Sequence, residues 1–188
     1  MNKIPLALTL LRALLAPVMV ALALWRPTAQ LFGLCLVAAF VSDVFDGVIA
    51  RRLGIATANL RRADSIADSI FYMSAVFAAW WLHPEVIYAH GTALLALLGL
   101  ELLRYAFDFA KFGKEASYHM WSSKAWGVAL VLGFLQLLAW GQDGVFVSLA
   151  IFIGIAADLE GLGISLVLKR WQTDVPSLMH ALRLRANS

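Results

Sequence analysis

The sequence predicts an all-α integral membrane protein with six transmembrane helices, and this prediction depends on its composition and its long apolar runs. Of the 188 residues, 62% are hydrophobic and only 14% are charged. A soluble domain is usually about half apolar, with about a quarter of its residues charged. Each apolar run approaches the ~20 residues that a helix needs to cross a bilayer. One membrane domain is therefore expected at residues 1–170, followed by a cytoplasmic or interfacial tail at residues 171–188.

The predicted spans are joined by short connections such as "HPEVIY" and "GQDG". The spans cover residues 4–25, 30–50, 60–82, 88–110, 121–140 and 145–168. A cleaved secretory signal is the alternative for the first run, but Arg12 interrupts that run and no clear small-x-small cleavage site follows it. The tail carries leucines among basic residues, and it either lies along the membrane interface or is unstructured.

The basic residues are unevenly distributed between the two sides of the membrane. One side holds both termini and the connections after the second and fourth spans, whereas the opposite side holds only Arg26. Because Lys and Arg accumulate in cytoplasmic loops, both termini are expected in the cytoplasm. A basic cytoplasmic face suits anionic lipid headgroups, and the sequence contains no recognisable nucleic-acid-binding module. The basic side holds Lys3, Arg51, Arg52, Arg61, Arg62, Lys111, Lys114, Lys169, Arg170, Arg183 and Arg185.

Four aspartates lie close together in the stretch "DVFDGVIARRLGIATANLRRADSIAD" at residues 43–68. Asp43 and Asp46 are three residues apart near the end of the second span, and Asp64 and Asp68 are four apart near the start of the third. These spacings place each pair on one helical face. Four carboxylates aimed at one place repel one another, and one or two divalent cations would remove that repulsion. Carboxylate oxygens without a Cys or His cluster favour Mg²⁺ or Mn²⁺.

The surrounding residues indicate an anionic ligand beside this metal site. Gly47 and Ala50 continue the face of Asp43 and Asp46 and leave room for a ligand to approach the backbone, and Arg51 adds a positive charge suited to a phosphate. A pyrophosphate would fit this pattern. The alternative is a solvated loop cluster, in which the aspartates pair with Arg51, Arg52, Arg61 and Arg62.

This stretch resembles the signature of the CDP-alcohol phosphotransferases, D-x2-D-G-x2-A-R-x8-G-x3-D-x3-D. The chain matches it at Asp43, Asp46, Gly47, Ala50, Arg51, Asp64 and Asp68. Leu60 stands where the signature has its second glycine, which puts the helix packing around the nucleotide in question but removes no ligand. Thr57 matches a threonine that is common three residues before that glycine.

The resemblance implies a role for each matching residue. The four aspartates would hold two divalent ions, Mg²⁺ or Mn²⁺, that bind the pyrophosphate of a CDP-linked lipid. Asp68 would also be the base that deprotonates the acceptor hydroxyl, which attacks the lipid-side phosphorus and releases CMP. A homodimer in the lipid bilayer is likewise implied. The residues expected to line the nucleotide pocket are Gly47, Ala50, Arg51 and Thr57.

The first span indicates which branch of the family is most similar. The segment "LTLLRALLAP", residues 8–17, resembles the first span of bacterial phosphatidylglycerophosphate synthases and the related cardiolipin synthases, although Leu6 replaces a frequent asparagine. This implies CDP-diacylglycerol as donor, glycerol 3-phosphate as acceptor and the bacterial inner membrane as location. Thr9 is a candidate for the nucleotide side of the cleft, which would open toward the cytoplasm. The alternative for Thr9 is a hydrogen bond within its own helix.

An acceptor with a phosphate group requires cations, and Arg104 and Lys124 lie within or beside apolar runs. The alternatives are an ion pair between Arg104 and Glu101, and a Lys124 side chain that extends to the headgroups. Arg12, inside the first span, should face protein or water. Asp158 or Glu160 of the sixth span is a candidate partner for it.

Other acceptors and other classes of protein remain as alternatives. The same chemistry is compatible with phosphatidylglycerol, inositol phosphate, inositol or serine as acceptor. An intramembrane prenyltransferase also binds diphosphate through Asp-rich motifs, but its two motifs generally lie far apart in the sequence. A cation transporter should show discontinuous helices with sites nearer the middle of the membrane.

Overall fold

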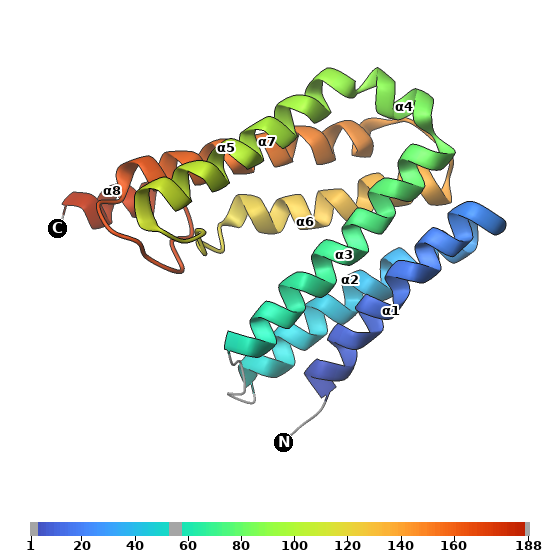
Figure 1. Cartoon of the computed structure of the whole chain (residues 1–188), viewed down its shortest axis with the longest axis horizontal. Coiled ribbons are helices and arrows are strands. Elements are labelled where there is room, and N and C mark those ends of the chain that lie inside the picture. The colour runs from blue at the N-terminus through green and yellow to red at the C-terminus, as the bar shows by residue number, and fades with distance from the viewer. Residues whose placement is uncertain (1–3, 53–57, 187–188) are drawn as a thin grey trace. The chain divides into compact units, whose positions relative to one another are not determined.

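The computed structural model describes the backbone of residues 4–52 and 58–186, and their side chains except those of residues 4, 50–52, 58, 59 and 61. The described residues are almost entirely helical and form two compact units (Figure 1). The first unit comprises Met1–Val86 and Phe134–Asp143, and the second comprises Ile87–Gly133 and Gly144–Ser188. The short helix α4 (Pro84–Ala89) lies where the chain passes from the first unit to the second.

The first unit is built from α1 (Ile4–Trp25), α2 (Ala29–Arg52) and α3 (Ala58–Leu82). Helix α1 packs against both α2 and α3 (Figure 1). Its buried residues recur every three or four positions and therefore share one face, which is the pattern of an amphipathic helix. Small side chains on this face allow close approach of the helix backbones. The buried face of α1 consists of Pro5, Thr9, Arg12, Ala16, Met19 and Ala23.

The opposite faces of these helices are also apolar. Leu14 on α1, Leu34 on α2 and Met73 on α3 are all more than 60% exposed. In water such a surface would be costly, whereas lipid chains solvate it. The five-residue π-helical segment η1 (Leu135–Ala139) continues from α6 (Trp121–Phe134) and packs on α2 and α3 in the same unit.

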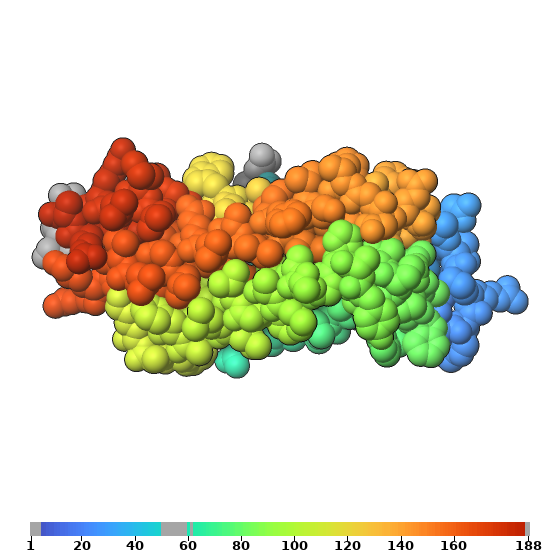
Figure 2. Space-filling model, turned by 90° about the horizontal axis from the view of Figure 1, so that it is seen from above, coloured from blue at the N-terminus to red at the C-terminus, as the bar shows by residue number. Residues whose placement is uncertain are grey.

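The second unit contains α5 (Gly91–Phe112), α6 up to Gly133, α7 (Val145–Val167) and α8 (Leu178–Ala186). Helices α5 and α7 lie side by side along their length, as the cartoon and the space-filling view both show (Figures 1 and 2). Glycines on α7 permit this packing. A Cβ atom at Gly154 would lie 2.9 Å from Leu97 Cδ1 on α5 and 2.6 Å from Trp126 Nε1 on α6. A Cβ atom at Gly161 would lie 2.9 Å from Arg104 Cδ on α5.

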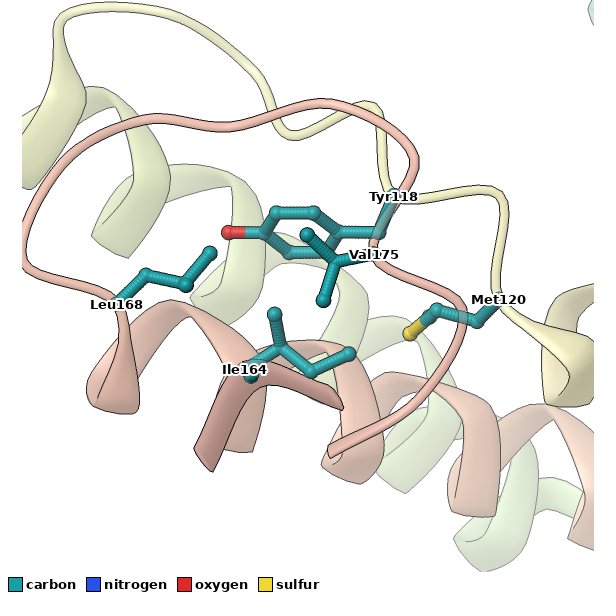
Figure 3. Packing of buried hydrophobic residues seen from close by; sticks show 6 residues of the cluster. Tyr118, Met120, Ile164, Leu168 and Val175 are labelled. Carbon is teal, nitrogen blue, oxygen red and sulfur yellow. The ribbon is translucent and has the colours of Figure 1, made fainter. Parts of the chain in front are cut away.

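A hydrophobic cluster closes one end of the second unit. Tyr118, Ile164, Leu168 and Val175 point toward one another in its centre (Figure 3). Backbone hydrogen bonds hold the two connecting segments together, from Asp174 N to Ser117 O at 3.0 Å and from Trp121 N to Pro176 O at 3.1 Å. Residues 171–186 are therefore folded against this unit, and the alternative of an unstructured tail is wrong for them. Their position at the membrane interface stays a prediction.

Five helices in the described part of the chain are long and apolar enough to cross a membrane by length and composition. They cover Pro5–Trp25, Ala29–Ile49, Arg62–Leu82, Trp121–Ala139 and Val145–Val167, close to five of the six predicted spans. Helix α5, which contains most of the remaining predicted span, is not among them. It carries Glu101, Arg104 and Asp108 within its apolar sequence.

The packing of α7 yields a stability prediction. Gly154→Ala should lower the free energy of unfolding by about 1–3 kcal/mol, because the added methyl overlaps the Trp126 ring. Gly99→Ala on α5 is the matched control, since a Cβ there meets no atom within 4 Å. That control should be neutral or stabilising by about 0.5–1 kcal/mol. Thermal unfolding in detergent measures both, and equal stabilities of the two variants would contradict the close packing at Gly154.

Candidate active site

The two aspartate pairs come from two neighbouring helices of the first unit, and their carboxylates converge. Asp43 and Asp46 lie near the end of α2, and Asp64 and Asp68 lie in the first half of α3. Asp43, Asp64 and Asp68 each offer a carboxylate oxygen, and these three oxygens lie within 4.8 Å of one another. The one-face arrangement expected from the spacings is therefore observed, and the structure brings both pairs together.

The guanidinium of Arg12 lies at the point where the carboxylates meet. Its Nη1 atom is 3.2 Å from Asp43 Oδ1 and 3.0 Å from Asp64 Oδ1, and it also donates to Asp68 Oδ1. Its Nη2 atom donates to Asp46 Oδ2 at 2.6 Å. The expectation that Arg12 pairs with Asp158 or Glu160 is wrong, because α1 packs against α2 and α3 and so places Arg12 among their aspartates.

Burial makes this pairing important for the first unit. Arg12 is only 1% exposed, and the side chain of Asp46 is 5% exposed. A buried charge without a partner is costly, and removing one member of a buried ion pair destabilises by about 3–5 kcal/mol. One guanidinium has five N–H donors, enough to contact four carboxylates at once. Four carboxylates against one guanidinium still leave a formal charge of −3, so the site favours cations.

The donor set fits a hard divalent cation. Mg²⁺ and Mn²⁺ prefer carboxylate oxygens, and the described residues supply three such oxygens in one small space. The side chains of Asp43, Asp64 and Asp68 are 45%, 31% and 31% exposed, so an ion can reach them from outside. The alternative was a solvated loop cluster in which the aspartates pair with four nearby arginines. Of these, Arg62 is exposed, and the side chains of Arg51, Arg52 and Arg61 lie outside the described residues.

The residues expected around the nucleotide are only partly described. Gly47 is half-buried on α2, one residue beyond Asp46. Ala50 and Arg51 belong to α2, but their side chains lie outside the described residues, as does the whole of Thr57. Thr9 is buried on α1, and its Oγ1 donates to Pro5 O at 3.1 Å, which is the hydrogen bond within its own helix that the sequence left open.

The two expected acceptor-binding residues lie in the second unit, and each has a neighbour there. Arg104 Nε is 3.1 Å from Asp158 Oδ1, so the ion pair in the structure joins Arg104 to Asp158. Lys124 Nζ lies 4.9 Å from the centroid of the Trp121 ring, a cation–π distance. These contacts hold both side chains in place and leave their role toward an acceptor as a prediction.

Sequence reasoning missed a hydrogen-bonded chain that crosses the second unit. Ser165 Oγ donates to the buried Asp108, and the Tyr118 hydroxyl, 2.9 Å away, therefore donates to Ser165 Oγ. Burial raises the pKa of the Tyr118 phenol, which keeps it protonated as this donor. Lys111 Nζ donates to Ser165 O at 2.8 Å. Asp108 inside an apolar run was the available signal for this network.

Glu160 also has a structural role that the sequence did not indicate. Its Oε2 accepts a hydrogen bond from Ser122 Oγ at 2.5 Å, and its Oε1 accepts one from Leu178 N at 3.1 Å. Ser122 lies in the first turn of α6, and Leu178 is the first residue of α8. The Glu160 carboxylate on α7 therefore binds the first turns of both α6 and α8. It accepts the hydrogen bond of the Leu178 amide, which has no acceptor within α8 because it lies at the start of the helix.

Comparison with known proteins identifies the family of the chain. The site and the apolar helices together define a membrane protein that is suited to bind divalent cations through carboxylates. The sequence profile of the CDP-alcohol phosphatidyltransferase family matches residues 2–157, so the chain belongs to this family. No significant match was found among curated proteins or among solved structures. Membership implies an enzyme of phospholipid biosynthesis that transfers a phosphatidyl group from a CDP-alcohol to an acceptor, typically with a divalent metal.

Proposed function

We propose that this protein transfers the phosphatidyl group of CDP-diacylglycerol to glycerol 3-phosphate, giving phosphatidylglycerophosphate and CMP. The observation that carries the proposal is the convergence of four aspartates from α2 and α3 in a chain of this family. The choice of donor and acceptor is supported by the resemblance of the first span to bacterial phosphatidylglycerophosphate synthases. Phosphatidylglycerol, inositol phosphate, inositol and serine are the competing acceptors.

The carboxylates of Asp43, Asp46, Asp64 and Asp68 would hold two Mg²⁺ or Mn²⁺ ions. Bound there, the ions neutralise charge that develops on the pyrophosphate and on the leaving CMP. Gly47 has no side chain, so the pyrophosphate can approach the α2 backbone beside the aspartates. Thr9, Ala50, Arg51 and Thr57 are the other residues proposed to bind the CDP-lipid.

In the proposed reaction the acceptor hydroxyl oxygen forms a bond to the phosphorus that carries diacylglycerol. The bond from that phosphorus to the bridging oxygen breaks, and CMP leaves with the bonding electrons. The hydroxyl proton passes to the carboxylate of Asp68. This residue suits the role of general base because its side chain is 31% exposed and therefore accessible to a second substrate.

The acceptor is the more specific part of the proposal. A phosphate monoester carries close to two negative charges at neutral pH, and cations are needed to hold it near carboxylates. Arg104 and Lys124 are proposed to do so because both lie within or beside apolar runs, where a charged side chain is usually functional. A neutral alcohol such as inositol would gain little from these two cations.

The arrangement in the membrane is part of the same proposal. We propose that α5 is the fourth of six membrane spans. Both termini and the opening of the cleft would then lie on the cytoplasmic side of a bacterial inner membrane, with the chain as a homodimer. The uneven distribution of Lys and Arg in the sequence supports the orientation. Helix α5 is long enough to span, with 22 residues, and Asp108, one of its charged residues, is buried in the protein.

Replacing the metal-binding aspartates tests the reaction and its metal dependence. Membranes that contain the protein should release CMP from CDP-diacylglycerol and glycerol 3-phosphate only with Mg²⁺ or Mn²⁺. Asp43→Asn, Asp46→Asn and Asp64→Asn should each lower turnover at least ~100-fold, because each removes a charge that holds the ions. Near-normal turnover in any two of these variants at saturating Mg²⁺ would argue against the two-ion site.

Asp68→Asn separates the role of base from that of ligand. If Asp68 accepts the hydroxyl proton, the variant should keep CDP-diacylglycerol affinity better than it keeps turnover. The measurement compares the Kd for the CDP-lipid with kcat in the same membranes, and Asp64→Asn is the control. An equal loss of affinity and turnover in Asp68→Asn would reduce Asp68 to a metal ligand only.

Arg104→Ala and Lys124→Ala test the acceptor. Each should raise the KM for glycerol 3-phosphate more than the KM for CDP-diacylglycerol, because each removes a cation from the acceptor phosphate. A panel of the competing acceptors is assayed in parallel with the unmodified protein. Preference for phosphatidylglycerol would indicate cardiolipin synthesis, and preference for an uncharged acceptor would contradict the phosphate-binding role.

A further inference from the structure

We infer that Arg12 competes with the divalent cation for the aspartates, so that an ion binds only when the Arg12 guanidinium is displaced. The inference depends on the metal site proposed above. It adds to that site a residue of α1, which lies outside the family motif at residues 43–68. It makes Arg12 a positioning residue that sets the affinity of the site for its ions.

The geometry does not allow a guanidinium and an ion in the same place. Nη1 of Arg12 lies 3.2 Å from Asp43 Oδ1 and 3.0 Å from Asp64 Oδ1, and it contacts Asp68 Oδ1 as well. These are the three residues whose oxygens lie within 4.8 Å of one another. An Mg²⁺ ion coordinated by these same Oδ1 atoms at about 2.0–2.1 Å would lie in, or directly against, the space that Nη1 fills, where the two positive charges repel each other. The two cations are therefore alternatives at these oxygens.

Two further contacts hold the guanidinium in this place. Nη2 donates to Asp46 Oδ2 at 2.6 Å, and Nε lies 3.5 Å from Ser42 Oγ. Ser42 is fixed in turn, because its hydroxyl donates to Ala39 O at 2.7 Å. With Arg12 only 1% exposed, its side chain is packed on all sides and moves only if these contacts break. Displacing Arg12 therefore costs free energy, and this cost weakens the apparent affinity for the ion.

The size of the effect follows from the fraction of molecules in which Arg12 has moved. When only that fraction binds the ion, the apparent Kd equals the intrinsic Kd divided by the fraction. Removing the guanidinium removes this penalty, and the ion should then bind more tightly. A purely structural Arg12 that ties α1 to α2 and α3 makes the opposite prediction. Its loss would let the repelling carboxylates separate and would weaken ion binding.

Direct measurement of Mn²⁺ binding decides between these outcomes without an activity assay. The full-length protein in nanodiscs is titrated with Mn²⁺, and the free ion is followed by electron paramagnetic resonance. Arg12→Met should bind Mn²⁺ at least ~10-fold more tightly than the unmodified protein. Arg12→Lys should fall between them, because an ammonium lacks the planar fork that contacts several carboxylates. Arg26→Met, which removes an exposed arginine that has no role in the proposed site, is the control and should leave the Kd unchanged.

Thermal unfolding provides a second readout on the same samples. Without divalent cations, Arg12→Met should unfold at a lower temperature than the unmodified protein, because four carboxylates lose their shared partner. Saturating Mn²⁺ should raise the Tm of this variant by more than it raises that of the unmodified protein, since the ion binds the variant more tightly.

An unchanged or weaker Mn²⁺ affinity in Arg12→Met would overturn the inference. If that variant does not fold, Arg12→Lys is judged by the same criterion: tighter binding supports competition, and equal or weaker binding overturns it. Failure of the unmodified protein and of every variant to bind Mn²⁺ is a different result, because it removes the metal site of the proposed function itself.

Discussion

The first unit is organised around one electrostatic constraint, the convergence of four carboxylates in an apolar helical bundle. Two aspartate pairs on α2 and α3 cannot share this space without a counter-charge, and Arg12 of α1 supplies it. Its buried position requires that α1 lie close to both other helices, and Ala16 and Ala23 on the same face permit that approach. Electrostatics and close packing therefore act together in the docking of α1.

The second unit meets the same difficulty with local pairs rather than one shared cation. Asp158 pairs with Arg104, while Asp108 receives its hydrogen bond through Ser165. Glu160 uses its two oxygens to hold the starts of α6 and α8. The four converging carboxylates of the first unit stand apart because one guanidinium leaves them with excess negative charge. That excess, rather than the mere presence of acids in an apolar chain, is what makes the first unit suited to bind cations.

Features set by local sequence were predictable, and features set by packing were not. The length of the apolar runs predicted the five helices that are long and apolar enough to cross a membrane. The three- and four-residue spacings predicted that each aspartate pair shares one helical face, because this depends only on helix geometry. The break between α4 and α5 at His90 and the π-helical segment η1 have no comparable signal in the sequence. The partner of Arg12 was missed because Asp46 lies 34 residues away, and such a pairing depends on which helices pack together.

The position of Arg12 also implies that the contacts that stabilise the docking of α1 work against the ion binding that the proposed reaction needs. The carboxylates that stabilise the docking of α1 through Arg12 are the ones that the proposed chemistry needs free for its ions. A hydrophobic residue at position 12 would leave the acids without a partner, and their mutual repulsion would oppose folding wherever divalent cations are scarce. A cation that bound the acids more firmly would protect the fold and exclude the ions. A single guanidinium shared among four carboxylates is a compromise, because it reduces the repulsion and still leaves a formal charge of −3 to attract the ions.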